Sequence, residues 1–243
     1  MAPHRGRGIY IFDAIGTLFD GSVLVDRLDR RFPGEGVALA AAWRATQLRM
    51  TWLRSLMDAY EPFDRVTRDA LAAVVRAAGR EATDVDLDDL AKMYGELPVY
   101  PEVAEVIETL VDLGSTLAIL SNGTPAMLMS LVERSGLRER FAVVLSVDAI
   151  RVYKPHPAVY RLASDHFGVA PRDVRFVSGN AWDCAGAKRF GFDVTAIDRV
   201  GTGVLEDLGE RPDRIGRDLR VLIDADRHAG ASAMNSRPVG DEV

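Results

Sequence analysis

Hydrophobic residues along the chain follow two kinds of pattern, which divide it into an initial strand, a helical stretch and an alternating part. Residues 9–12, Ile-Tyr-Ile-Phe, form an apolar run that predicts a buried strand. From there to Leu97, apolar positions recur at helical spacing and no strand pattern appears. From Glu102 onward, short helical and strand patterns alternate. The chain is therefore expected to form one strand, then a helical block, then a series of strand–helix units.

Individual elements follow from the same patterns. In the helical block we expect helices over Val37–Met57, Arg65–Ala78 and Val85–Tyr94. In the alternating part we expect helices over Glu102–Leu113, Ala126–Ser135, Pro157–Phe167 and Ala185–Phe190. The strands between them are expected over Thr116–Leu120, Val143–Ser146, Val174–Val177 and Val194–Ile197. This alternation predicts an α/β fold with a Rossmann-like parallel sheet and helices on both faces.

The helical block separates the first strand from the rest of the sheet, so we interpret it as an insertion. The core is expected to comprise residues 1–19 and 98–227, and an all-helical cap to comprise residues 20–97. The natural place of the cap is above the C-terminal edge of the sheet, where ligands bind in open α/β folds. Residues 228–243 are rich in small and polar side chains and are expected to form a disordered tail.

Composition narrows the classes of function. The chain has 243 residues, 48% hydrophobic and 27% charged, which is ordinary for a globular protein. Its formal net charge of -6 disfavours binding to nucleic acid or to an acidic membrane surface. Cys184 is the single cysteine, so we expect no disulfide framework and a reducing, cytoplasmic compartment. The first eight residues precede no long apolar segment, so no signal peptide or membrane span is expected.

Polar residues suited to chemistry follow several of the predicted strands. Asp13 directly follows the first strand, and Thr17 comes shortly after it. The second strand runs into Ser121–Thr124, and Lys154 lies in a loop before a predicted helix. Residues 178–183, Ser-Gly-Asn-Ala-Trp-Asp, follow another strand. Because ligands in open α/β sheets bind at the carboxyl ends of the strands, we expect these residues to form one site.

An acid, a Ser or Thr, a Lys and an acid on successive loops form the motif set of the haloacid dehalogenase superfamily. Within it, the chain resembles the L-2-haloacid dehalogenases. The likeness spans most of the chain and rests on FDAIGTLFD at Phe12–Asp20, WRATQLRMTWLRSLM at Trp43–Met57, LSNG at Leu120–Gly123, SVDAIRVYKPHPAVY at Ser146–Tyr160 and FVSGNAWD at Phe176–Asp183. It implies a metal-independent and cofactor-independent hydrolase that converts short (S)-2-haloacids into (R)-2-hydroxy acids through an aspartyl ester.

Two positions argue against the phosphatases of the same superfamily. Those enzymes have a second Asp two residues after the nucleophile, and a further acid in the last loop that helps to hold Mg²⁺. Here Ile15 and Gly179 occupy these positions. Ile15 cannot protonate a leaving group, so phosphoryl transfer would lack its acid. A Mg²⁺-dependent phosphatase and a non-catalytic binding protein remain as less favoured alternatives.

The resemblance also implies a role for each candidate residue. Asp13 is the nucleophile, and Asp183 is the general base for hydrolysis of the ester. The residues expected to position the base, the water and the nucleophile are Lys154, Asn180, Ser178, Thr17 and Tyr160. Arg44 and Asn122 are expected to hold the halide. The remaining substrate contacts are expected from Ser121, Lys154, the backbone of Ala14 and Ile15, and the apolar side chains of Leu48, Phe63 and Trp182.

Two pocket positions depart from the family pattern. Ile15 stands where typical members have Tyr, and Ala45 stands where they often have Gln. These changes leave the range of substrates open, and a related hydrolase acting on azetidine-2-carboxylate or fluoroacetate is the main alternative.

The first long helix bears on assembly. Between Val37 and Met57 it carries more apolar residues than one face can bury, namely Leu48, Met50, Trp52, Leu53, Leu56 and Met57. Such an excess predicts a homodimer. The alternative is a helix buried on two sides within its own cap.

Overall fold

The computed structural model describes residues 8–201 and 206–223, and within them one parallel sheet forms the centre of the fold. The strand order is β3-β2-β1-β4-β5-β6. The strands are β1 Ile9–Phe12, β2 Thr116–Ser121, β3 Val143–Ser146, β4 Val174–Ser178, β5 Asp193–Ile197 and β6 Arg214–Gly216. In register, Phe12 lies between Ile119 and Val177. The predicted α/β class with a parallel sheet is confirmed.

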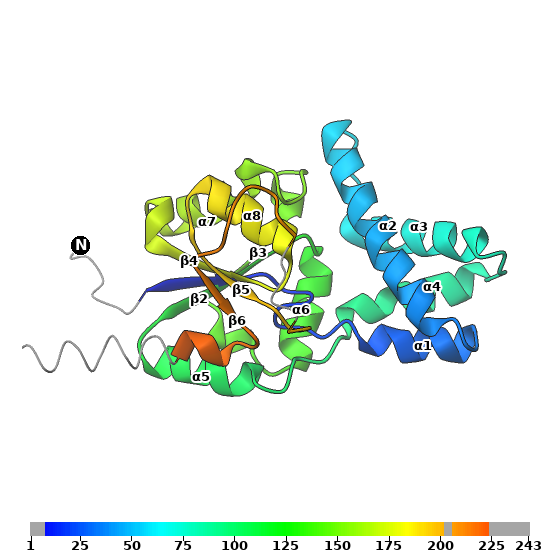
Figure 1. The fold of residues 1–243 in the computed structure, drawn as a ribbon, viewed down its shortest axis with the longest axis horizontal. Helices are drawn as coiled ribbons and strands as arrows, with labels where there is room; N and C mark the ends of the chain where they lie inside the picture. The colour runs from blue at the N-terminus through cyan, green and yellow to red at the C-terminus, as the bar shows by residue number, and fades with distance from the viewer. Residues whose placement is uncertain (1–7, 202–205, 224–243) are drawn as a thin grey trace, which may run out of the picture.

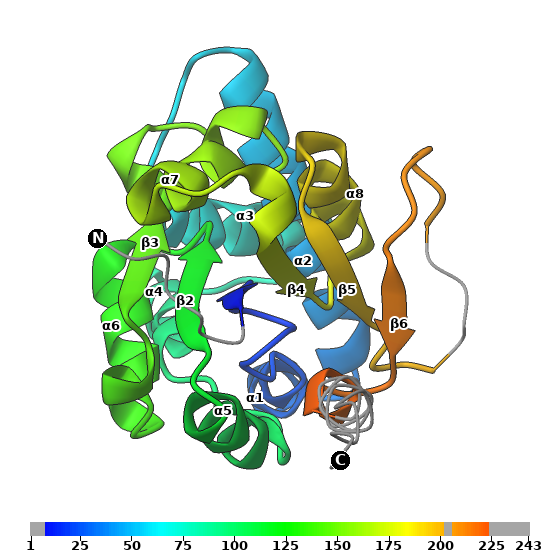
Figure 2. The same cartoon turned by 90° about the vertical axis from the view of Figure 1, so that its left-hand side faces the viewer.

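Helices cover both faces of this sheet, as Figure 2 shows: α7 and α8 lie on one side and α5 on the other. The core helices are α5 Val103–Asp112, α6 Pro125–Arg134, α7 Pro157–Phe167 and α8 Ala181–Phe190. Short 3-10 helices are η1 Met93–Gly95, η2 Arg138–Arg140, η3 Val147–Ala149 and η4 Pro171–Asp173. The four inner strands β1, β2, β4 and β5 are largely buried between these helices, which explains their continuous apolar runs in the sequence.

The helices between β1 and α5 form a separate group beside the sheet (Figure 1). They are α1 Val23–Arg31, α2 Gly36–Leu56, α3 Phe63–Ala77 and α4 Asp84–Lys92, and we call them the cap. The cap stands at the end of the sheet towards which the strands point. Its two connections to the core pair with each other, because Asp20 N–H donates to Pro98 O at 2.8 Å and Tyr100 N–H donates to Leu18 O at 3.0 Å. The boundaries at residues 20 and 97 stay a prediction.

The structure differs from the sequence prediction mainly in the start of one helix and in two additional elements. The last core helix begins at Ala181 rather than Ala185, so Asp183 lies in its first turn and not in the preceding loop. The strand β6 and the helix α1 had not been assigned, because β6 spans only three residues and α1 buries only Leu24 and Leu28 among charged neighbours. The expected tail, residues 228–243, lies outside the described residues. Among the described helices, none is both long and apolar enough to cross a membrane.

Candidate active site

Asp13 lies in the loop directly after β1, at the edge of the sheet beneath the cap, and it is 6% exposed. Its backbone N–H donates to Val177 O at 2.9 Å, which continues the β1–β4 pairing. Its Oδ1 accepts from Lys154 Nζ at 3.1 Å. Its Oδ2 accepts from Thr17 Oγ1 at 3.1 Å and from Asn180 Nδ2 at 2.8 Å. The carboxylate is therefore fixed by three donors from three different loops.

Lys154 is fully buried and lies between two carboxylates. Its Nζ donates to Asp13 Oδ1 at 3.1 Å and to Asp183 Oδ2 at 2.8 Å, and it lies 5.0 Å from the centre of the Phe176 ring. Burial alone would lower the pKa of Lys154, but the two carboxylates outweigh it and the pKa is raised. The ammonium group therefore stays charged and balances one of the two acids.

Asp183 is fully buried and accepts hydrogen bonds at both oxygens. Oδ1 accepts from the Tyr160 hydroxyl at 2.8 Å, and Oδ2 accepts from Ser178 Oγ at 3.1 Å as well as from Lys154. Burial, aided by the charge of Asp13 and opposed by Lys154, raises the pKa of Asp183 to about 6. A carboxylate with a pKa in this range can accept a proton from water near neutral pH.

Asn180 connects this cluster to the cap. Its Nδ2 donates to Asp13 Oδ2 at 2.8 Å and to Ile15 O at 3.1 Å, and its Oδ1 accepts from Arg44 Nη2 at 3.3 Å. Arg44 is a half-buried residue of α2, so the cap contributes a cation directly to the site. The site thus contains two carboxylates, which pair with Lys154, and a second cation, Arg44, which reaches Asp13 through the Asn180 amide.

Asn122 lies on the β2 side of the same edge and is 7% exposed. Its Oδ1 accepts from the backbone N–H of Lys154 at 3.1 Å, so its amide NH2 group is the end that can donate to an anion. Ser121, at the end of β2, accepts from Gly123 N–H at 3.2 Å and has no hydrogen bond to the other candidates within the described part of the chain. Ala14 and Ile15 are buried directly after Asp13.

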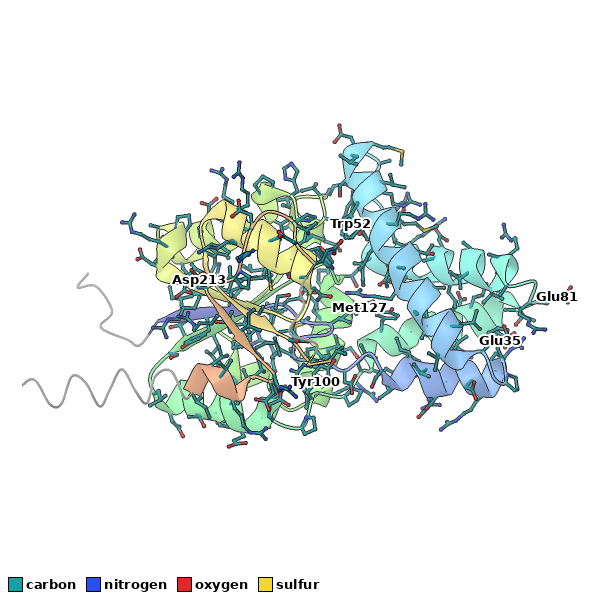
Figure 3. All side chains as sticks on the ribbon, in the orientation of Figure 1. Glu35, Trp52, Glu81, Tyr100, Met127 and Asp213 are labelled. Atoms are coloured by element: carbon teal, nitrogen blue, oxygen red, sulfur yellow. The ribbon has the colours of Figure 1, made fainter. Side chains whose placement is uncertain are left out.

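The side chains of the three apolar candidates, Phe63, Leu48 and Trp182, have no hydrogen bonds that tie them to the charged residues of the site within the described part of the chain, so their positions are given by burial and ring contacts. Phe63 is buried in the cap against Tyr94 and Tyr153, while Leu48 and Trp182 are half-buried. The ring of Trp182 meets that of Trp52 edge-on, with centroids 5.7 Å apart. Figure 3 shows Trp52 on the side of α2 that faces the core. This aromatic pair joins the cap to the start of α8, next to Asn180, where it can exclude water.

The carboxylates of the site do not form a cluster that could bind a metal ion. Among the described residues, no group of three or more His, Cys, Asp or Glu side chains has a suitable arrangement. Asp13 and Asp183 instead share the ammonium group of Lys154. Ile15, buried at 7% exposure, supplies no acid beside the nucleophile.

Two residues that hold Arg44 and Tyr160 in place were not predicted from the sequence. Gln47, a buried residue of α2, accepts from Arg44 Nη1 at 2.8 Å. Gly186, inside α8, leaves room for Tyr160, because a Cβ there would lie 2.4 Å from the Tyr160 hydroxyl oxygen. The available signals were a polar residue three positions after Arg44, on the same helical face, and a glycine inside a helical pattern.

Comparisons with known proteins show which family this chain is similar to. A family model described as haloacid dehalogenase-like hydrolase matches residues 8–191. The (S)-2-haloacid dehalogenase of Xanthobacter autotrophicus is 45% identical over 80% of this chain and 76% of its own length. The (S)-2-haloacid dehalogenase of Pseudomonas sp. strain YL is 41% identical over 91% of this chain and 95% of its own length.

A solved structure is also similar. The L-2-haloacid dehalogenase from Xanthobacter autotrophicus, with chloropropionic acid covalently bound, superposes with a TM-score of 0.83 and 38% identity. The match covers 90% of this chain and 98% of that one. The resemblance therefore includes both the cap and the core.

Proposed function

This chain belongs to the haloacid dehalogenase-like hydrolases, and we propose that it acts as an (S)-2-haloacid dehalogenase. Its substrates would be short 2-haloalkanoic acids, hydrolysed to (R)-2-hydroxy acids. One observation carries this proposal: the buried carboxylate of Asp13 is held by Lys154, Thr17 and Asn180 with Ile15, rather than an acid, beside it. A halide leaves without a proton, so this arrangement suits attack on carbon.

In the first step, a carboxylate oxygen of Asp13 attacks C2 of the substrate from the side opposite the halogen. The new C–O bond forms as the carbon–halogen bond breaks, and C2 is inverted. The departing halide needs donors in a site with little water. Arg44 keeps its charge when desolvated, and the NH2 group of Asn122 adds a further donor. Ser121 and the backbone N–H groups of Ala14 and Ile15 would bind the substrate carboxylate.

In the second step, water hydrolyses the ester on Asp13. Asp183 takes one proton from the water as the water oxygen attacks the carbonyl carbon of the ester. The bond between that carbon and the substrate oxygen then breaks, and the substrate oxygen takes up a proton and leaves as the hydroxyl group of the product. Asp13 returns to its carboxylate form as the remaining proton is released to solvent. Ser178, Tyr160 and Lys154 hold Asp183 through the hydrogen bonds described above. Asn180, which donates to Asp13 Oδ2 in the resting site, would hold the ester carbonyl in place.

The mechanism needs neither a metal nor a cofactor. Two acids and two cations leave the site close to neutral, so a dication would lack enough anionic ligands. The alternative phosphatase would need an acid at Ile15 or Gly179, and neither residue can provide one. Metal independence therefore belongs to the same proposal.

Chloride release from the two enantiomers of 2-chloropropionate tests the proposed function. Purified protein with EDTA should release chloride from the S enantiomer and none from the R enantiomer. Release from the R enantiomer alone, or no release from either, would refute it. Chloride release that EDTA abolishes and Mg²⁺ restores would contradict the proposed metal independence, and Mg²⁺-dependent release of phosphate from a phosphate ester, without chloride release, would favour the phosphatase alternative.

A homodimer, formed through the cap, is part of the proposal. The outer side of α2 carries exposed apolar residues at helical spacing, namely Ala38, Ala41, Ala42, Ala45, Leu53 and Leu56. Leu53 is 42% exposed and Leu56 is 82% exposed, and together with the alanines they form an exposed apolar strip of the kind that protein interfaces bury. Light scattering should give twice the 26.6 kDa of one chain, and a mass of one chain would contradict the dimer.

Location is proposed from the chemistry of the single cysteine. Cys184 is buried against the Ser178 carbonyl, and its burial raises the pKa of the thiol. A single buried thiol cannot form a structural disulfide, which fits a reducing, cytoplasmic compartment.

A further inference from the structure

A line of hydrogen bonds inside the cap leads to Arg44. Thr67 Oγ1 donates to the carbonyl oxygen of Phe63 at 2.6 Å, one turn earlier in α3. Gln47 Nε2 donates to Thr67 Oγ1 at 2.7 Å, and Arg44 Nη1 donates to Gln47 Oε1 at 2.8 Å. Gln47 and Thr67 are both fully buried. The guanidinium group is therefore anchored from within the cap.

The same line continues into the core. Arg44 Nη2 donates to Asn180 Oδ1 at 3.3 Å, and Asn180 Nδ2 donates to Asp13 Oδ2 at 2.8 Å. Arg44 is thus the junction at which the hydrogen-bond network of the cap meets that of the nucleophile. A displacement of the Gln47 side chain would therefore change the position of Arg44 and the hydrogen bonds of both networks.

Chemistry fixes the orientation of each amide in this line. A guanidinium group can only donate, so Gln47 must present its carbonyl oxygen to Arg44 and its NH2 group to Thr67. The Thr67 hydroxyl accepts that hydrogen and therefore gives its own proton to Phe63 O. Rotating the Gln47 amide by half a turn would break two hydrogen bonds at a buried position. Gln47 is consequently locked in one orientation.

The acceptors on Arg44 are neutral amides rather than carboxylates. Gln47 and Asn180 satisfy two of the five N–H donors of the guanidinium group without cancelling its charge. The other three N–H donors can serve an anion. An acid at residue 47 would accept the same hydrogen bond, but it would neutralise Arg44 and weaken the attraction for a halide or a carboxylate.

We propose that Gln47 is a positioning residue that acts through Arg44 and sets the affinity of the site for the halide. This inference rests on the proposed dehalogenase function and extends it to a residue that touches no substrate. The neutral amide at residue 47 holds the guanidinium group in place and leaves its charge available. Thr67 supports Gln47 in turn.

Two substitutions of Gln47 distinguish the effect of a charge beside Arg44 from the effect of losing the hydrogen bond that anchors Arg44. Gln47→Glu keeps an acceptor for Arg44 but adds a negative charge, whereas Gln47→Met keeps the volume and removes the acceptor. Thr51→Val is the matched control, because Thr51 is buried in the same helix and its hydroxyl, within the part of the chain that the structure describes, donates only to Leu48 O. Thermal unfolding of all three variants checks that the fold is retained.

Kinetics and halide binding give the readout. Gln47→Glu keeps the hydrogen bond to Arg44 but adds a negative charge beside the halide site, so KM and the chloride inhibition constant should rise by about tenfold. Gln47→Met should lower kcat by about tenfold, because the guanidinium group loses its anchor. Thr51→Val should match the wild type in all three quantities.

Bromide binding without substrate distinguishes this proposal from the proposed function. Quenching of tryptophan fluorescence by bromide, in the region of Trp52 and Trp182, reports halide affinity in the absence of turnover. Weaker bromide binding in folded Gln47→Glu supports the role of Gln47 even if no dehalogenation is found. Bromide affinity and chloride inhibition equal to those of the wild type, in folded Gln47→Glu and Gln47→Met, would overturn it.

Discussion

Gly179 and Gly16 pack so closely that a Cβ atom at residue 179 would lie 2.2 Å from the Gly16 carbonyl oxygen. No side chain fits at that distance unless the backbone moves. Gly16 itself has a φ of +85°, which favours glycine there. The loop that bears Asp13 and the segment that leads from β4 into α8 therefore meet through a contact that leaves no room for an acidic side chain at residue 179.

Replacing Asp13 by Asn should abolish turnover without unfolding the protein. The amide keeps the size of the side chain but is a far weaker nucleophile, so kcat should fall by about a thousandfold or more. Chloride release and circular dichroism measure the two effects. Asp26→Asn, the same change at an exposed position of α1, should behave as the wild type. Wild-type rates in Asp13→Asn, without slow conversion to Asp, would refute the covalent step.

Replacing Asp183 by Asn should stop the reaction after the first step. Attack by Asp13 needs no base, whereas hydrolysis of the ester does. Intact-protein mass spectrometry after mixing with (S)-2-chloropropionate should show the mass of the substrate less hydrogen chloride. The double variant Asp13→Asn/Asp183→Asn should remain unmodified. A folded Asp183→Asn variant that carries no adduct would remove Asp183 from the second step.

The hydrolysis step should depend on pH through Asp183. In the resting site its pKa is raised to about 6, mainly by burial, with a contribution from the charge of Asp13. The ester removes that charge, so the inflection for hydrolysis should lie at or below that value. The base must be deprotonated to act, so the active fraction should fall by about tenfold for each pH unit below the inflection, and the rate should level off above it. The Tyr160 hydrogen bond lowers the pKa of Asp183, so Tyr160→Phe should move the inflection to higher pH. A profile that stays in place or moves to lower pH would contradict this role of Tyr160.

Gly186→Ala should impair catalysis although it changes no polar group. A Cβ at residue 186 would lie 2.4 Å from the Tyr160 hydroxyl oxygen and 2.6 Å from Pro155 Cβ. Replacing glycine by alanine inside a helix normally stabilises the folded protein by about 1 kcal/mol. A loss of stability or activity in this variant would therefore report the steric contact with Tyr160. We expect kcat to fall by about tenfold as Tyr160 is displaced from Asp183. Gly21→Ala, where the added Cβ meets nothing within 4 Å, should be neutral.

The sequence predicted the parts of the fold that depend on local pattern. The apolar run before Asp13 is a buried strand, and the strand–helix alternation after Glu102 is a parallel sheet. Asp13, Lys154 and Asp183 each come after a strand of the parallel sheet, and since such strands end at one edge, the sequence predicted that these residues lie close together. The role of each remains a proposal.

Other features depend on contacts between distant segments, which no local pattern encodes. Arg214–Gly216 becomes a strand because it pairs with β5 and not because of its own composition. Gln47 looks like an ordinary polar residue until Arg44 and Thr67 are seen on either side of it. The start of α8 at Ala181 was missed because the segment from Asn180 to Asp183 resembles a loop with a capping residue.

A single turnover in water enriched in oxygen-18, with enzyme in excess over (S)-2-chloropropionate, tests the central claim most directly. If Asp13 forms an ester that water opens at the carbonyl carbon, the hydroxyl oxygen of the product comes from Asp13. We therefore predict an unlabelled product and one oxygen-18 atom in the peptide that contains Asp13. A product labelled in that first turnover, with Asp13 unlabelled, would show that water attacks the substrate directly and would contradict the account.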